Sequence, residues 1–185
     1  MQLDSVNKLS PTTIALHWFI AIGFIGIFVL GKYMDIAHDY SMYPIHKSLG
    51  VLIVLVVVPR LLWRYRNGLP KPLYDHSLQE KAATAVHLTL LAATILMPIS
   101  GMMMSGFSGH GIPIFGFDLV AANPDPANPG EVIALNETLA EIGHVVHGAL
   151  QWVIIVSLVL HIGGALKHHF KDKDGTLSRM LGKKV

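Results

Sequence analysis

The chain of 185 residues contains no cysteine. This absence excludes disulfides, thiolate metal sites, iron–sulfur clusters and the C-x-x-C-H attachment of a c-type haem. Any haem or metal ion would therefore be held without a thiolate, and histidine is the first ligand to consider. The chain has 11 histidines, a large number for a protein this apolar.

Charged residues are scarce as well. They make up 14% of the chain, whereas a soluble domain averages about 25%. Hydrophobic residues make up 52%, and the mean hydropathy is +0.50. This balance indicates an integral membrane protein. The formal net charge is only +2, so the distribution of the charges is more informative than their sum.

Four apolar stretches approach the ~20 residues that a membrane-spanning helix needs. They run from about Thr13 to Gly31, His46 to Trp63, Ala82 to Met104 and His144 to Leu166. The first is not followed by the cleavage pattern of a signal peptide, so we expect it to be retained. The prediction is an all-α fold in which residues 1–185 form one domain, a bundle of four transmembrane helices.

Lysine and arginine are distributed unevenly among the segments outside these spans. They gather in the link between the second and third spans and in the C-terminal tail, as Arg64, Arg66, Lys71, Lys81, Lys167, Lys171, Lys173, Arg179, Lys183 and Lys184. Residues 105–143 contain neither, but carry five carboxylates, on Asp118, Asp125, Glu131, Glu137 and Glu141. Since basic segments stay in the cytoplasm, both termini are predicted to be cytoplasmic and the loop 105–143 periplasmic. Its prolines and glycines predict turns, with a short surface helix from Glu131 onward.

Ionisable or metal-binding side chains within a membrane span are functional candidates, because they are costly there. His147 and His161 are 14 residues apart on one predicted helix. This spacing puts them within about 40° of one face and about 21 Å apart along the axis. By depth, His17 at the inner end of the first span pairs with His161, and His46 at the outer end of the second pairs with His147. The spacing predicts two bis-histidine sites.

Small residues beside these histidines would leave room for a flat macrocycle. They are Gly23, Gly26, Gly50, Gly163 and Gly164, although close helix packing uses the same residues. Two other interpretations remain open. The histidines could be hydrogen-bonded packing residues, or could hold zinc as in a metal transporter. Zinc sites usually gather three or four ligands at one depth, whereas these form two separate pairs.

Four further histidines near the spans have less certain roles. His87 lies on the inner half of the third span and could face an inner haem, a quinone head group or packing neighbours. His144 competes with His147 as the outer ligand, although His144 and His161 share a helix face less well. His168 and His169, at the cytoplasmic end of the fourth span, could approach the inner haem edge or be solvated.

A series of short motifs spans nearly the whole chain. They are A-L-H-W at 15–18, I-H-K-S-L-G at 45–50, P-R-L-L-W-R at 59–64, H-L at 87–88, H-x13-H-x6-H-H-F at 147–170 and K-D-K-D-G-T-L-S-R-M at 171–180. In their order and spacing the chain resembles the bacterial cytochrome b561 family.

The resemblance implies a four-helix bundle of the bacterial inner membrane that carries electrons through two haem b groups. Carried over to this chain, the iron ligands would be His17 with His161 for the inner haem, and His46 with His147 for the outer haem. Related cytochrome subunits anchor larger hydrogenases and formate dehydrogenases. One branch of the family oxidises periplasmic superoxide and passes the electrons to ubiquinone.

The sequence and the resemblance together favour a quinone-linked oxidoreductase with a periplasmic donor, either superoxide or a small redox protein. His87, His168, Arg60 and Arg64 are candidates to contact the quinone or the haem propionates. The acidic outer loop should repel an anion and attract a basic protein such as a cytochrome c. A haem-bearing anchor subunit of a larger redox enzyme is the alternative. Membrane lipid is a further expected partner, and nucleic acid is not expected to bind.

Overall fold

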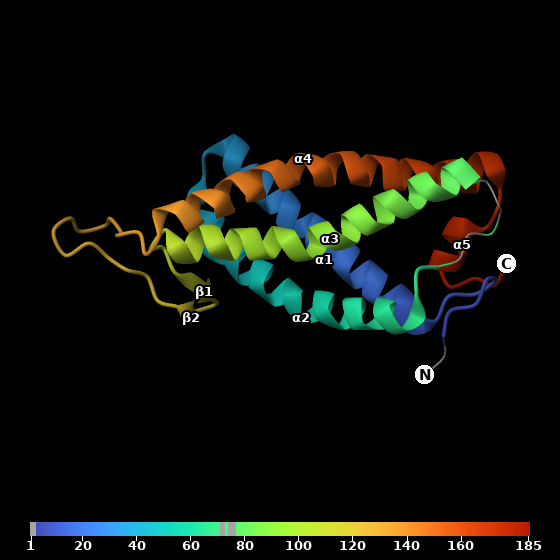
Figure 1. The fold of residues 1–185 in the computed structure, drawn as a ribbon, viewed down its shortest axis with the longest axis horizontal. Coiled ribbons are helices and arrows are strands. Elements are labelled where there is room, and N and C mark those ends of the chain that lie inside the picture. The colour runs from blue at the N-terminus through green and yellow to red at the C-terminus, as the bar shows by residue number, and fades with distance from the viewer. Residues whose placement is uncertain (1–2, 71–72, 74–76) are drawn as a thin grey trace. The chain divides into compact units, whose positions relative to one another are not determined.

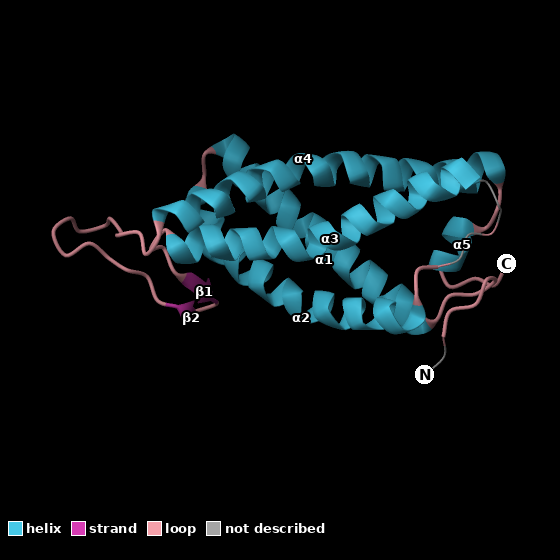
Figure 2. Cartoon of the chain, in the orientation of Figure 1, coloured by secondary structure: helices cyan, strands magenta, loops and turns pink. Residues whose placement is uncertain are grey.

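The structure is a computed structural model that describes residues 3–70, 73 and 77–185, so that Lys71 and His76 lie outside the described residues. Four long helices make up most of it (Figure 1), namely α1 (Pro11–Ala37), α2 (Tyr43–Asn67), α3 (Ser77–Phe107) and α4 (Glu137–Lys167). Shorter elements are the 3-10 turn η1 (Tyr40–Met42), the strands β1 (Ile112–Ile114) and β2 (Phe117–Val120), the π-helical turn η2 (His168–Asp172) and α5 (Thr176–Met180). Figure 2 shows how little of the described chain is strand.

All four long helices are long and apolar enough to cross a membrane. This finding confirms the predicted all-α fold with four spans. Large apolar side chains point outward along them, for example Ile22 at 70% exposure, Leu55 at 69% and Val159 at 66%. An exposed apolar surface of this extent would be unfavourable in water, and in a bilayer it is the surface that lipid covers.

The helices extend a few residues beyond the predicted apolar stretches because polar groups cap their ends. At the start of α1 the amide of Thr13 donates to the hydroxyl of Ser10 at 3.1 Å, and Pro11 occupies the first helical position. At the start of α4 the amide of Leu139 donates to the side-chain oxygen of Asn136 at 3.0 Å. Such caps are made by residues outside the apolar run, so hydropathy alone underestimates helix length.

The loop between α3 and α4 differs from the prediction of turns and a helix from Glu131. It contains an antiparallel hairpin of β1 and β2, and helix begins only at Glu137. Phe115, with φ of 46°, and Gly116, with φ of 91°, form the tight turn between the strands. The amide of Phe115 donates to the hydroxyl of Ser48 on α2 at 3.0 Å. This contact between distant segments holds the hairpin. No local sequence pattern could therefore predict the hairpin.

The chain divides into two compact units, and each long helix contributes to both. The first unit comprises Met1–Ala21, Val56–Ala93 and Val153–Val185, and the second comprises Ile22–Leu55 and Thr94–Trp152. His17, His87 and His161 belong to the first unit, and His46 and His147 belong to the second. Each histidine group can therefore be described within its own unit.

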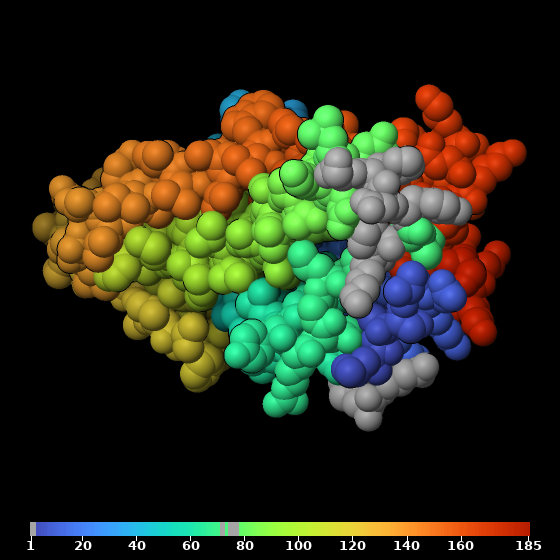
Figure 3. Space-filling view, turned by 45° about the vertical axis from the view of Figure 1, so that its right-hand side comes forward, coloured from blue at the N-terminus to red at the C-terminus, as the bar shows by residue number. Residues whose placement is uncertain are grey.

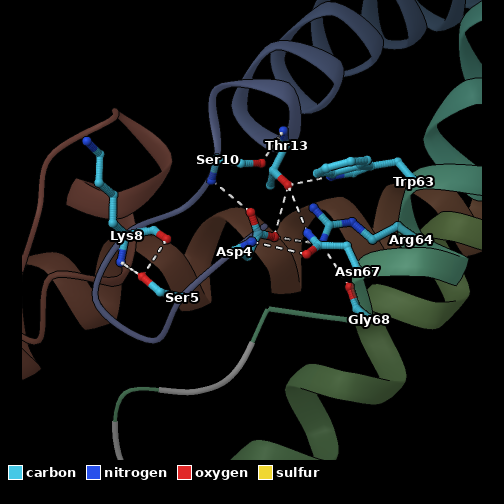
Figure 4. A network of polar contacts seen from close by, with 9 residues as sticks. All are labelled: Asp4, Ser5, Lys8, Ser10, Thr13, Trp63, Arg64, Asn67 and Gly68. Atoms are coloured by element: carbon cyan, nitrogen blue, oxygen red, sulfur yellow. Dashed lines mark hydrogen bonds and ion pairs between the residues drawn. The ribbon is translucent and has the colours of Figure 1, made fainter. Parts of the chain in front are cut away.

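A buried polar network ties the N-terminal segment of the first unit to the end of α2 (Figure 4). The carboxylate of Asp4 accepts hydrogen bonds from the Ser10 amide at 2.8 Å and from the Thr13 hydroxyl at 2.9 Å. The guanidinium of Arg64 lies 3.3 Å from the same carboxylate. The Thr13 hydroxyl also accepts a hydrogen bond from the indole of Trp63 at 2.8 Å. Asp4 thus connects the start of α1 with the cytoplasmic end predicted for α2.

The two termini of the chain meet within the same unit. Figure 3 shows the N-terminal residues (blue) in contact with the C-terminal residues (red). The Arg179 guanidinium donates to the Val6 carbonyl at 2.5 Å, and the Val185 amide donates to the Asn7 carbonyl at 3.1 Å. Arg179 is only 4% exposed. The C-terminal tail is therefore a packed element of the first unit.

Replacing Asp4 by Asn should destabilise the protein, because the amide cannot keep all the hydrogen bonds and loses the charge that faces Arg64. The expected loss is about 1–3 kcal/mol in the free energy of unfolding, measured by denaturant titration in detergent. Asp118→Asn is the control, since Asp118 lies in an exposed strand of the hairpin. Equal stability of the Asp4→Asn and control variants would contradict the role of the network.

The same network predicts a pH dependence. Partial burial alone would raise the pKa of Asp4, but hydrogen bonds from Ser10 and Thr13 and the charge of Arg64 together lower it. The folded pKa is then below the unfolded value of about 3.9, so the stabilisation is present above that pH and is lost as the pH falls toward the folded pKa. Asp4→Asn should lack this part of the acid sensitivity.

Candidate functional site

Within the first unit, His17 of α1 and His161 of α4 face each other. Their ring centroids are 6.1 Å apart, and the ring planes are inclined by 50°. Two metal–nitrogen bonds of about 2 Å, together with the radii of the two rings, require a centroid separation of about 6 Å when one ion is bound between two imidazoles. The spacing of this inner pair, named for its predicted depth, therefore fits a single metal centre with two axial histidines.

His87 of α3 is a third ring beside the inner pair. Its centroid lies 5.2 Å from that of His161, with the planes at 71°. The sequence predicts no partner for His87, and the structure shows that it is in ring contact with a proposed ligand. The edge-to-face separation is shorter than an ion between two rings requires, so His87 fits the role of a neighbour of the site better than that of an axial ligand.

The two arginine candidates near the inner pair differ in their partners. Arg64 is held by Asp4 at 3.3 Å and by the Gly68 carbonyl at 3.0 Å. Arg60 is partly buried, and its charge acts on His17, His87 and His161. Within the described part of the chain no hydrogen bond or ion pair is found for Arg60. Its guanidinium is thus available to an anionic or carbonyl group at the inner site.

Within the second unit, His46 of α2 and His147 of α4 form the outer pair. Their ring centroids are 6.4 Å apart and their planes are nearly perpendicular, at 84°. The buried Nδ1 atom of His46 has no hydrogen-bond partner among the described residues. The predicted partners are therefore brought together again, at a spacing that fits one ion between two imidazoles.

Glycines of neighbouring helices let the backbone approach both outer rings. A Cβ atom added to Gly31 would lie 3.0 Å from Cε1 of His46, and one added to Gly101 would lie 3.1 Å from Cε1 of His147. Neither glycine is among those that the sequence predicts to lie beside the histidines. A glycine in the interior of a helix, where it weakens the helix, is the signal that could have found them.

Four of the five glycines predicted to leave room for a macrocycle have open space beside them. Cβ atoms added to Gly26, Gly50, Gly163 or Gly164 would meet no atom within 4 Å. Gly23 differs, because its added Cβ would lie 2.9 Å from the Ile53 side chain. Gly23 therefore serves contact between α1 and α2, whereas the other four have no neighbouring atom that requires a glycine.

His144, the competing outer ligand, lies on another side of α4. Its side chain is 69% exposed and faces Glu141 at 3.7 Å. The structure brings His147, not His144, into ring contact with His46. This arrangement favours His147 as the outer ligand.

His168 is engaged by carboxylates at the end of α4. Its Nδ1 atom contacts Asp174 and lies 3.2 Å from Asp172. Burial would raise the pKa of Asp174, but hydrogen bonds from Thr176 and His168 lower it, so its carboxylate is an acceptor. His168, Asp172 and Asp174 are close enough to share a metal ion. However, the ammonium of Lys167 lies 2.7 Å from Asp172 and already supplies a positive charge, so we assign no metal to this cluster.

Comparisons with known proteins found one matching family model and several relatives. The model of the family described as prokaryotic cytochrome b561 matches residues 8–183. The chain is 38% identical to "Cytochrome b561 homolog 2" of Escherichia coli (strain K12) over 97% of this chain and 94% of that protein. It is 27% identical to "Cytochrome b561 homolog 1" of the same organism, over 95% and 98% of the two chains. It is also 27% identical to "Probable superoxide oxidase CybB" of Yersinia pestis, over 96% and 98%.

The choice between His144 and His147 can be tested directly. If His147 is the outer ligand of a haem, His147→Ala should lose that haem, whereas His144→Ala should keep the haem content of the wild type. The measurement is haem content per chain, together with the reduced-minus-oxidised spectrum of each purified variant. Loss of haem in His144→Ala with retention in His147→Ala would show that the ligand is His144.

Proposed function

The chain belongs to the prokaryotic cytochrome b561 family, and we propose that it carries electrons across the bacterial inner membrane through two b-type haems. Membership of the family makes it a multi-pass bacterial membrane protein with a b-type haem and a role in membrane electron transfer. To this we add the number of haems, their ligands, the quinone and the donor. The whole chain, residues 1–185, is treated as one membrane cytochrome domain.

The observation that carries the proposal is the spacing of the two histidine pairs, at 6.1 and 6.4 Å between ring centroids. His17 and His161 would hold the inner haem, and His46 and His147 the outer haem. When bound, such haems supply one-electron carriers whose axial positions are both filled, so that neither iron has an open position for oxygen chemistry. The protein supplies their orientation and the surroundings that set their potentials.

At the inner pair we assign a role in binding quinone or the haem propionates to residues that are not iron ligands. Arg60 would neutralise a haem propionate or donate to a quinone carbonyl, because its guanidinium has no partner among the described residues. His87, in ring contact with His161, would border the same space. His168 contributes only if its Nε2 atom faces that space, since its Nδ1 atom is held by carboxylates. Arg64 would act by holding the N-terminal segment through Asp4.

The direction of the chain in the membrane follows from its charges. The basic link and tail would put both termini in the cytoplasm, and the acidic segment 105–143 outside. Quinone would then exchange electrons near the inner pair, and the donor near the outer pair. Together these assignments describe a quinone-linked oxidoreductase of the inner membrane.

The nature of the donor depends on the charges at the outer face. Lys32 and Lys47 are the outside cations, and Lys32 is paired with Asp35 at 2.6 Å. Lys47 lies 5.8 Å from the ring centroid of Tyr43. With one of two cations already neutralised and five carboxylates in the loop, the outer face should attract a basic redox protein rather than an anion. Superoxide remains the specific small-molecule candidate, since one relative is named a probable superoxide oxidase.

The first test is the haem content of purified full-length protein. We expect close to two b haems per chain and a b-type reduced-minus-oxidised spectrum. Turnover with quinone and a small donor would support an oxidoreductase, whereas haem without such turnover would favour an anchor subunit of a larger enzyme. A protein that stays colourless when expressed with ample haem, or that holds zinc instead, would contradict the proposed function.

The second test concerns the donor. Electron exchange with a basic c-type cytochrome should slow by roughly tenfold or more as salt screens the acidic loop, and should slow likewise in Asp125→Asn/Glu131→Gln. The rates are measured by stopped-flow absorbance, with Glu80→Gln as a control in the segment predicted to be cytoplasmic. If superoxide reduces the protein faster than the basic cytochrome exchanges electrons, and the loop charges do not matter, superoxide is the better candidate.

A further inference from the structure

The imidazole of His147 is held on one side by α3. Its Nδ1 atom lies 3.0 Å from the carbonyl oxygen of Met97 and 3.1 Å from the hydroxyl oxygen of Ser100. The Ser100 hydroxyl itself donates to the Met97 carbonyl at 2.9 Å. Two oxygen atoms, themselves joined by a hydrogen bond, therefore meet at one nitrogen of a residue proposed to bind haem.

The partners determine which nitrogen of His147 carries the proton. A carbonyl oxygen only accepts, so Nδ1 must carry a hydrogen to interact favourably with Met97. The hydroxyl hydrogen of Ser100 is already directed to the same carbonyl, which leaves the Ser100 oxygen free to accept from Nδ1. The lone pair of His147 is then on Nε2, the atom available to a metal ion.

The surroundings make this arrangement rigid. Ser100 is only 2% exposed, so water does not compete with the hydroxyl. A Cβ atom added to Gly143, one turn before His147, would lie 2.5 Å from the Met104 amide nitrogen and 2.9 Å from the Ser100 carbonyl oxygen. The backbones of α3 and α4 are thus in close contact beside this group. Neither helix can shift here without losing that contact.

The other proposed outer ligand, His46, has fewer polar contacts. The Ile27 carbonyl acts on the His46 ring, but the Nδ1 atom of His46 forms no hydrogen bond among the described residues. His147 is therefore the proposed outer ligand with the larger number of hydrogen-bond partners.

We propose that Ser100 and the Met97 carbonyl are positioning groups for His147, which fix its Nε2 atom toward the outer haem and lower the potential of that haem. The inference rests on the proposed function, because it takes His147 as an iron ligand. A hydrogen bond from Nδ1 makes the imidazole a stronger donor, and a stronger donor stabilises the oxidised iron more than the reduced iron. Removing one acceptor should therefore make the outer haem easier to reduce.

The test is a redox titration of the full-length holoprotein carrying Ser100→Ala. We expect the outer haem to shift toward the reduced form by roughly three- to tenfold at a given potential, where tenfold corresponds to about 59 mV for one electron. The inner haem should not shift, and Ser100→Thr, which keeps the hydroxyl, should restore the wild-type value. The outer haem is identified as the component that His46→Ala lacks.

Ser105→Ala is the matched control. Ser105 is another buried serine of α3, and its hydroxyl donates to the Gly111 carbonyl at 2.6 Å without contacting a histidine. This variant should leave both potentials unchanged. If it shifts the outer haem as much as Ser100→Ala does, the effect is a general one of loosened packing and the proposal is wrong.

The remaining outcomes also decide the matter. If Ser100→Ala loses the outer haem alone and Ser100→Thr regains it, the positioning role is supported. Loss of both haems, no rescue by threonine, or an unchanged outer potential with full haem content would overturn it. Wild-type protein without haem would contradict the proposed function as well. If the wild type holds two haems and Ser100→Ala leaves the outer potential unchanged, only this inference is wrong.

Discussion

The hydrocarbon core of a bilayer offers no hydrogen-bond partner, so every polar group within it has to be satisfied by the protein. This constraint accounts for the four long helices, whose backbones satisfy themselves, and for the outward apolar side chains. It also makes each intramembrane histidine informative, because imidazole needs a partner there as well. The Met97 carbonyl supplies such a partner to His147, and the proposed iron ligation would supply one to each ring of the two histidine pairs.

The same constraint explains what the sequence alone could predict. The lengths of the apolar stretches predict the four spans. In a helix, the 14-residue spacing of His147 and His161 places them at two different depths. The histidine pairs then follow by depth, and the structure places their rings in contact. Their role as haem ligands remains a prediction, supported by the spacing and by the family.

What the sequence could not predict depends on contacts between residues far apart in the chain. The hairpin is held by the hydroxyl of Ser48, 67 positions before Phe115. The Ser100–His147 contact joins residues 47 positions apart. Nor does composition distinguish Gly23, which packs against Ile53, from Gly26, which leaves open space. Serines and glycines are common in membrane helices, so only the packed structure reveals which of them touch a ligand.

The two histidine sites differ in the polar groups around them, and the difference bears on the direction of electron flow. At the inner pair Arg60 adds a positive charge that acts on all three histidines, which favours an added electron. At the outer pair the Met97 carbonyl and Ser100 would strengthen His147 as a donor, which would favour the oxidised state of a haem held there. Under the proposed ligand assignment both effects place the higher potential at the inner pair. A periplasmic donor would then reduce the outer haem, and the electron would move from there to the inner haem and on toward quinone.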